Sequence, residues 1–201
     1  MESIKNFILS LLTWVGDSPL RLFSVILLCT LSGAGWFLYT EKDAFMSSYR
    51  AQQALPKMNG NYEAAAAFII KNSTAELVAI YDVNTLLNTR KLVYFTTRSG
   101  GRDKVNDGTD VGLLTKNYDN NNDVISLMSG KIPCSRYLSP QSYMGFVYKE
   151  HGVEFMCRAS VPPEAGTFIG QISVGWRTVV ADPAESQTIM LIASGLLFGR
   201  K

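Results

Sequence analysis

The sequence predicts an α+β protein in which one N-terminal transmembrane helix is followed by a domain of antiparallel sheet packed with helices. Three observations support this prediction. Residues 22–39 are apolar and carry no charge. Runs of β-branched and aromatic residues then alternate with turns rich in Gly, Asn and Asp, which is typical of strands. Helical patterns stand before and after these runs, and 201 residues suffice for one domain with an anchor.

Composition favours a folded chain and excludes one class of partner. Hydrophobic residues make up 47% of the chain and charged residues 18%, which is enough apolar material for a packed core. The net charge is +2, and Lys and Arg are scattered along the chain. Because nucleic-acid binding needs a concentrated basic face, no nucleic-acid partner is expected.

Residues 1–19 are expected to form an amphipathic head. Apolar side chains recur there at helical spacing over three turns. They are Ile4, Phe7, Ile8, Leu11, Leu12 and Val15. A helix of this kind beside a membrane span lies in the bilayer interface or against a partner helix, so membrane lipid is an expected partner.

Residues 20–40 are expected to be the transmembrane helix. At ~1.5 Å per residue the uncharged part is about 27 Å long, which matches the hydrocarbon core of a bilayer. Ser18 followed by Pro19 is typical of a helix start. At the other end, Trp36 and Tyr39 favour the headgroup level.

One face of this helix carries small side chains. Cys29, Thr30, Gly33 and Ala34 form a stripe along it. Small residues let helix backbones approach closely, and in lipid such packing drives association. The stripe predicts a homo-oligomer, and the alternative is a lipid-facing helix that only tolerates small residues.

Two properties of the N-terminal region stay open. Residues 32–34 are small, as at a signal-peptide cleavage site, although the leader is long and carries charges of both signs. Lys5 and Arg21 precede the span while Lys42 and Arg50 follow it, so charge does not set the orientation.

Residues 41–201 are expected to form the α+β domain. Pro56 ends a helical continuation of the span, and Asp182, Pro183 and Glu185 are a strong signal for a final helix. A Gly-containing turn at 150–152 predicts a hairpin, and the polar stretch 99–123 predicts a long connection with one short turn of helix at most. Helices are expected at 41–58, 61–71 and after Asp182, and strands at 77–81, 92–96, 143–148, 153–157 and 168–176. This arrangement resembles PAS and GAF sensor modules.

Two cysteines lie in the predicted domain. Cys134 and Cys157 permit one disulfide if the domain faces an oxidising compartment. The alternative is a pair of unbonded thiols, because the sequence does not give the distance between them.

Chemical signals are few. His151 is the single histidine and falls in a predicted turn, where a solvated side chain is the simpler interpretation. Residues 119–123 resemble the start of a calcium loop, but position twelve of such a loop would be Gly130. We therefore expect no catalytic, metal or cofactor site, no enzyme activity and no small-molecule substrate, and a domain that binds a partner.

Three features together resemble the holins of T-even bacteriophages. The layout is a head, one span and a large C-terminal domain. Cys157 followed by residues 170–177, which end in Trp176 and Arg177, resembles the late cysteine and strand of that family. Residues 196–201 resemble its basic tail.

This resemblance implies a protein of the host inner membrane that assembles into lesions, releases the phage endolysin and times host lysis. The N-terminus would be cytoplasmic, and the periplasmic domain would bind an antiholin through residues that the sequence does not identify. The family carries a second cysteine in its last helix, whereas residues 186–198 contain none, which puts the disulfide in doubt. The alternative is a membrane-anchored extracytoplasmic sensor or binding module of PAS or GAF type.

Overall fold

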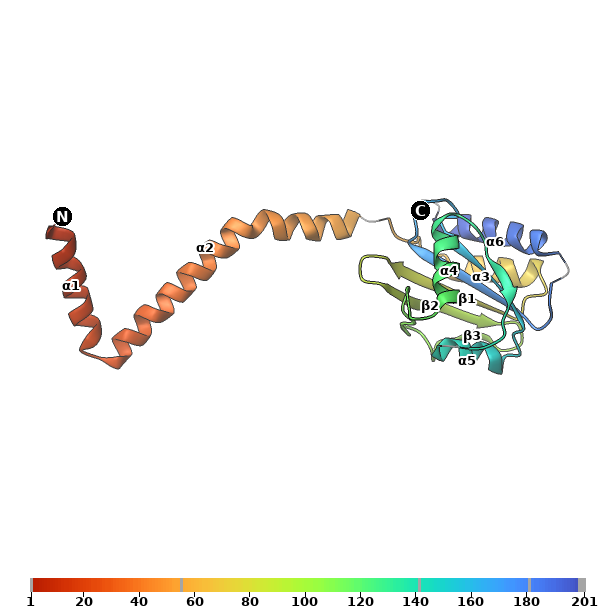
Figure 1. The fold of residues 1–201 in the computed structure, drawn as a ribbon, viewed down its shortest axis with the longest axis horizontal. Coiled ribbons are helices and arrows are strands. Elements are labelled where there is room, and N and C mark those ends of the chain that lie inside the picture. The colour runs from red at the N-terminus through yellow and green to blue at the C-terminus, as the bar shows by residue number, and fades with distance from the viewer. Residues whose placement is uncertain (1, 55, 141, 181, 199–201) are drawn as a thin grey trace. The chain divides into compact units, whose positions relative to one another are not determined.

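The computed structural model describes residues 2–54, 56–140, 142–180 and 182–198, without some side chains of the two N-terminal helices. The chain divides into two compact units, Met1–Leu55 and Pro56–Lys201. Each unit is described by itself below (Figure 1).

The first unit consists of two helices, α1 (Glu2–Gly16) and α2 (Pro19–Ala54). Where the two helices join, Arg21 donates from Nη1 to the carbonyl oxygen of Trp14 at 3.4 Å, and its guanidinium lies 5.0 Å from the Trp14 ring centre. Within α2, the stretch Pro19–Lys42 is long and apolar enough to cross a membrane. This confirms an N-terminal helix able to span a bilayer, while its orientation stays a prediction.

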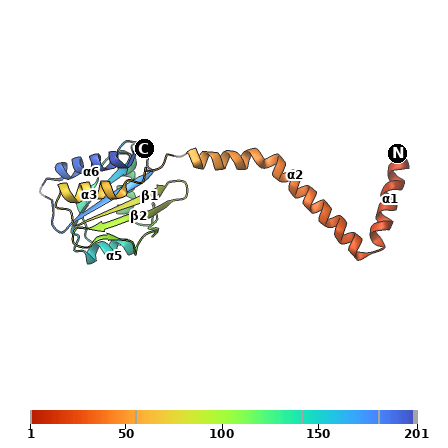
Figure 2. The same cartoon turned by 180° about the vertical axis from the view of Figure 1, so that it is seen from behind.

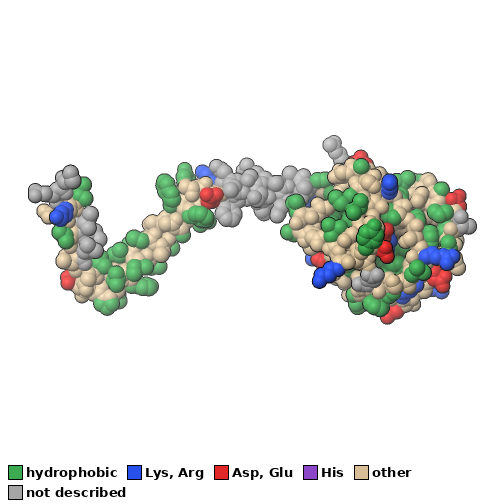
Figure 3. All heavy atoms as spheres, in the orientation of Figure 1, with side chains coloured by type: hydrophobic (Ala, Val, Ile, Leu, Met, Phe, Trp, Pro, Cys, Tyr) green, Lys and Arg blue, Asp and Glu red, His purple; other side chains and the backbone are tan. Residues whose placement is uncertain are grey.

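The surface of the span is apolar, and α2 runs past the predicted boundary at residue 40. Large side chains such as Phe23, Leu31 and Phe37 are exposed along it. Figure 3 shows hydrophobic side chains in green on this helix. The helical continuation expected from residue 41 is confirmed, since α2 ends at Ala54, two residues before Pro56. An exposed apolar helix of this length is suited to a lipid environment.

The predicted head and stripe are placed on these helices. The side chains of Phe7, Ile8, Leu11 and Leu12 lie outside the described residues. Of the other two head residues, Ile4 is exposed and Val15 is half-buried.

In the stripe, Cys29, Thr30, Gly33 and Ala34 are all exposed. The hydroxyl of Thr30 donates to carbonyls of its own helix, and the space beside Gly33 is open. Helix association through this stripe stays a prediction.

The second unit is built on a six-stranded antiparallel sheet, so the predicted α+β class is confirmed. The strand order is β3-β2-β1-β6-β5-β4. The strands are β1 (Leu77–Asn84), β2 (Thr89–Thr97), β3 (Gly101–Asp103), β4 (Cys134–Arg136), β5 (Phe155–Val161) and β6 (Gly170–Trp176). Helices α3 (Tyr62–Asn72) and α6 (Pro183–Phe198) cover one face, and α5 (Tyr143–Glu150) lies on the other (Figures 1 and 2).

Strand alternation divides the core between the two faces, because successive side chains of a strand point to opposite sides. On β6, Ile172 and Val174 join the apolar cluster beneath α3 and α6. On the opposite face, Met156 of β5 joins a second cluster that includes Met144 and Tyr148 of α5. A third, smaller cluster seats α4 (Tyr118–Met128).

The first residues of the second unit, Met58 and Asn59, contact β6 and α6. Met58 packs against Gly170 so closely that a Cβ at that glycine would collide with the Met58 sulfur. The Asn59 backbone N–H donates to the Leu197 carbonyl at 2.9 Å, and its side-chain amide donates to the Leu196 carbonyl at 2.8 Å. These bonds satisfy two carbonyls at the end of α6 that lack partners within the helix.

Two sequence predictions are corrected. Residues 143–148 form helix α5 rather than a strand, so the hairpin with 153–157 is wrong. The hydroxyl of Ser142 accepts from the Gly145 backbone N–H at 3.2 Å and caps this helix.

Residues 99–123, expected to be a long connection with one short turn of helix at most, hold strand β3 and the start of the eleven-residue helix α4. Asn117 caps α4, since its side-chain oxygen accepts from the Asn120 backbone N–H at 2.9 Å. Residues 119–123 are therefore helical and not a loop.

The structure bonds the two domain cysteines. Cys134 and Cys157 are opposite residues of the β4–β5 pair and are joined by a disulfide. Of the two alternatives left by the sequence, the bonded one is present. Strand β4, which the sequence did not indicate, is thus held to the sheet edge both by its ladder and by a covalent link.

Candidate functional site

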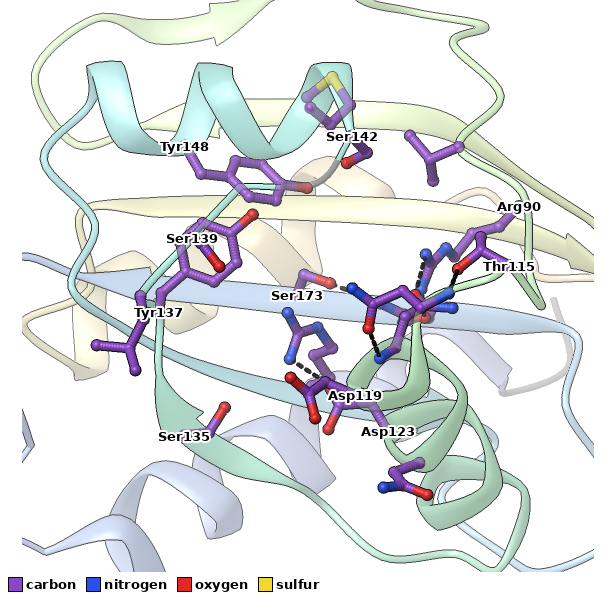
Figure 4. Close-up of a pocket in the computed structure, with 18 of the residues that line it drawn as sticks. Arg90, Thr115, Asp119, Asp123, Ser135, Tyr137, Ser139, Ser142, Tyr148 and Ser173 are labelled. Carbon is purple, nitrogen blue, oxygen red and sulfur yellow. Dashed lines mark hydrogen bonds and ion pairs between the residues drawn. The ribbon is translucent and has the colours of Figure 1, made fainter.

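A pocket of about 440 Å³ lies on the sheet face opposite α3 and α6, between α4 and α5 (Figure 4). The sheet forms its floor, with Tyr81 from β1, Arg90 from β2, Arg158 from β5, and Gln171 and Ser173 from β6. These residues are distant in sequence and meet only because β1, β2, β5 and β6 lie in one sheet.

Arg90 is the most deeply buried cation of the floor, with 8% of its surface exposed. Its Nη1 donates to Gln171 Oε1 at 3.0 Å, and its Nη2 donates to Asn120 Oδ1 at 2.9 Å. Its Nε has no hydrogen-bond partner among the described residues. Burial lowers the pKa of Arg90 from its usual value, but a guanidinium stays charged at neutral pH.

The second cation of the floor is neutralised. Arg158 Nη1 lies 2.5 Å from Asp123 Oδ2, and both side chains are partly buried. In the described part of the chain no carboxylate lies within ion-pair distance of Arg90. The floor therefore holds one compensated and one uncompensated positive charge.

Three tyrosines line the side of the pocket next to α5. The hydroxyls of Tyr81 and Tyr148 hydrogen-bond to each other, and the ring of Tyr137 meets the ring of Tyr148 edge-on, with centres 6.1 Å apart. Burial raises the pKa of Tyr81 and raises that of Tyr148 well above its ordinary value. Both phenols stay protonated at neutral pH. In the bond between them one hydroxyl donates and the other accepts, which leaves one O–H to donate to a ligand.

Chemically, the pocket offers donors and positive charge in a partly enclosed space. Among the residues that the structure describes, no group of three or more His, Cys, Asp or Glu side chains is placed to hold a metal. His151 lies at the end of α5 with its ring 5.7 Å from that of Phe95, and it does not line the pocket. The arrangement suits the binding of a polar molecule rich in acceptors.

None of the site residues predicted from sequence lines this pocket. Cys134 and Cys157 stand beside it, because β4 leads into the Ser135–Ser139 segment at its rim. One signal in the sequence could have indicated the pocket: Gln171 and Ser173 alternate with apolar residues in a strand that is buried on both faces. Polar residues in such a strand indicate a site rather than plain packing.

Comparisons with known proteins concern the fold. No family model matches the chain, and no curated protein matches it. Among solved structures, it is similar to the GAF domain of a two-component sensor histidine kinase from Bacillus halodurans, at 9% identity over 64% of this chain and 84% of that chain, with a TM-score of 0.47. It is also similar to a GAF domain region of a putative membrane protein from Geobacter sulfurreducens, at 14% identity over 65% and 84%, with a TM-score of 0.45. A third is the chromophore-binding domain of a bacteriophytochrome from R. palustris, at 10% identity over 78% and 60%, with a TM-score of 0.49.

The comparisons correct the prediction of a bacteriophage holin that controls host lysis. The similar structures named above are GAF and chromophore-binding domains, and none of them is a holin or a lysis protein.

Proposed function

We propose that this protein is a membrane-anchored binding module whose second unit holds a small polar molecule in the pocket beneath α4 and α5. The observation that carries the proposal is the floor of the pocket. Arg90, Arg158, Gln171 and Ser173 occupy positions of buried strands that, for packing alone, would be apolar. Burying such groups is costly, so their convergence in one cavity is explained by a ligand that uses them.

The anchor and the disulfide support a location for this module. The stretch Pro19–Lys42 is suited to a single span. The bond between Cys134 and Cys157 favours an oxidising compartment, since cytosolic thiols are kept reduced. We therefore propose that the domain faces the extracytoplasmic side of the membrane.

Binding is tested on the full chain in detergent micelles. Thermal unfolding is followed against separate panels of sugars, amino acids, carboxylates, phosphates and nucleosides, and co-purified molecules are identified by native mass spectrometry. Ser139→Trp, which fills the exposed rim of the pocket, should abolish the stabilisation, while Ser129→Trp at the end of α4 should retain it. Failure of every panel to stabilise the chain would contradict a binding function.

Location is tested by protease protection. In spheroplasts of a Gram-negative host, an added protease should digest the domain, and in inverted inner-membrane vesicles the domain should be protected. The reverse pattern would place the domain in the cytoplasm and contradict the proposed side.

A further inference from the structure

One edge of the Arg90 guanidinium is only half occupied. The Nη1 end is tied to Gln171. On the Nε–Nη2 edge, Nη2 donates to the amide oxygen of Asn120, whereas Nε has no partner in the described part of the chain. These two N–H groups are parallel and match the two oxygens of a carboxylate or phosphate.

Building on the proposed function, we propose that the pocket ligand is a small molecule with an oxyanion group that seats on this edge of Arg90 and displaces the amide of Asn120. Asn120 offers one neutral oxygen, while an oxyanion offers two oxygens and a charge. Charge-assisted bidentate bonds are the stronger kind, so the anion outcompetes the amide. It also gives Nε its missing acceptor.

The charges around the site favour an anion at Arg90 rather than at Arg158. Asp123 is already paired with Arg158 at 2.5 Å. Asp119 also lines the pocket but is exposed to solvent, which screens its charge. The Tyr81 ring faces the guanidinium at 5.7 Å and adds no formal charge.

Asn120 belongs to helix α4, so its displacement from Arg90 also affects the contacts of that helix. It lies in the first turn of α4, and its other side-chain contacts are to the Leu113 carbonyl at 2.8 Å and to Asn121 at 3.3 Å. The buried apolar contacts of α4 are made by Val124 and Leu127, which lie toward its other end. Displacement from Arg90 therefore removes one of the side-chain bonds that hold the first turn of α4, while the bonds to Leu113 and Asn121 stay.

The test uses the full chain in detergent micelles, with the arginine Nε–H groups observed by ¹⁵N NMR. Succinate and glycerol 3-phosphate are the anionic probes, and succinamide and glycerol are their neutral counterparts. At least one anion should bind and move the Nε–H signal of Arg90, which is assigned by its loss in Arg90→Lys. The pair of anions distinguishes a carboxylate ligand from a phosphate ligand, and the neutral probes should leave the signal in place.

Variants of Asn120 separate displacement from a merely structural role. Asn120→Ala removes the competitor and should tighten anion binding several-fold. Asn120→Asp supplies its own carboxylate to Arg90 and should abolish binding. Ile125→Ala changes an exposed residue of the same helix that does not line the pocket, and it should leave affinity unchanged.

Arg90→Lys keeps the charge but loses the paired donors, so anion affinity should fall at least tenfold. Equal affinity in this variant, or weaker binding in Asn120→Ala, would overturn the inference. Binding of neutral molecules alone would overturn it while leaving the proposed function in place. If no probe or panel bound at all, both would fail.

Discussion

The two faces of the sheet are made by the same strands, yet they bury different chemistry. Beneath α3 and α6, β6 contributes Ile172, Val174 and Trp176 to a continuous apolar cluster. On the other face, the intervening Gln171 and Ser173 belong to the pocket and hydrogen-bond to each other at 2.7 Å. A shift of one residue along the strand thus separates the apolar cluster from the polar floor of the pocket, because the side-chain period is two.

This difference indicates a division between a face that mainly stabilises the fold and a face that holds the proposed site. The face beneath α3 and α6 holds the larger apolar cluster and is expected to contribute most to stability, since buried apolar area is the main favourable term of folding. On the other face, a second apolar cluster under α5 stands beside the polar floor, where the proposed ligand would bind.

The largest effect is expected on the apolar face. Ile172→Ala leaves a cavity under α6 and should lower the free energy of unfolding by about 2–5 kcal/mol. Ile125→Ala, at an exposed position of α4, should stay within ~0.5 kcal/mol of the parent. Urea unfolding of the full chain in micelles measures both, and similar losses in the two variants would contradict the division.

A comparable effect is expected at the sheet edge. The disulfide of Cys134 and Cys157 closes a loop with a sequence separation of 23, so its reduction should cost about 3 kcal/mol by the chain-entropy estimate. Thermal unfolding with and without dithiothreitol measures this loss. Cys29→Ser controls for the exposed thiol of the span and should not change the response to dithiothreitol.

A smaller effect is expected from the compensated charge pair of the pocket. The Arg158–Asp123 pair is partly buried at 2.5 Å, so a double-mutant cycle of Arg158→Met and Asp123→Asn should give a coupling free energy of about 1 kcal/mol. Unfolding of the four chains in urea provides the cycle. A coupling energy of zero would show that the two side chains do not act together.

The smallest effect is expected from the buried phenol of Tyr148. Its pKa in the folded chain lies well above the ordinary 10.0 because burial disfavours the phenolate. The resulting stabilisation is complete below pH 10.0 and is lost as pH rises toward the folded-state pKa. Stability should therefore decline above that pH, and Tyr148→Phe should flatten the decline.

Tyr118→Phe is the matched control for this measurement, because Tyr118 is exposed. It should leave the pH profile of urea unfolding as it is in the parent chain. An equal change in both variants would mean that burial of Tyr148 has no special part in the alkaline decline.

Local signals explain what could be predicted of the fold. Pro183 and Glu185 indicate the start of α6, and the uncharged run indicates the span; both are properties of short segments. Helix α5 was missed because its aromatic and β-branched residues favour a strand on propensity alone. The Ser142 cap and the close packing of Gly145 against the Tyr137 hydroxyl decide otherwise.

The pocket could not be predicted in the same way. Arg90 and Gln171 are 81 residues apart, and they meet only because β6 lies beside β1 and β1 beside β2. Arg90 also stands at the start of its strand, where a charged residue is unremarkable in sequence. Pairing of distant strands is a tertiary property, so a polar floor emerges only once the order of the strands is known.

The contacts of Met58 with Gly170 and of Asn59 with the end of α6 also bear on how the domain would respond to a pulling force. A force that stretches the chain between the membrane span and the domain enters the second unit at these two residues. Met58 bears on Gly170, which is the direct neighbour of Gln171, and Gln171 holds Arg90. A pull on Met58 is thus expected to act on the strand that positions the guanidinium.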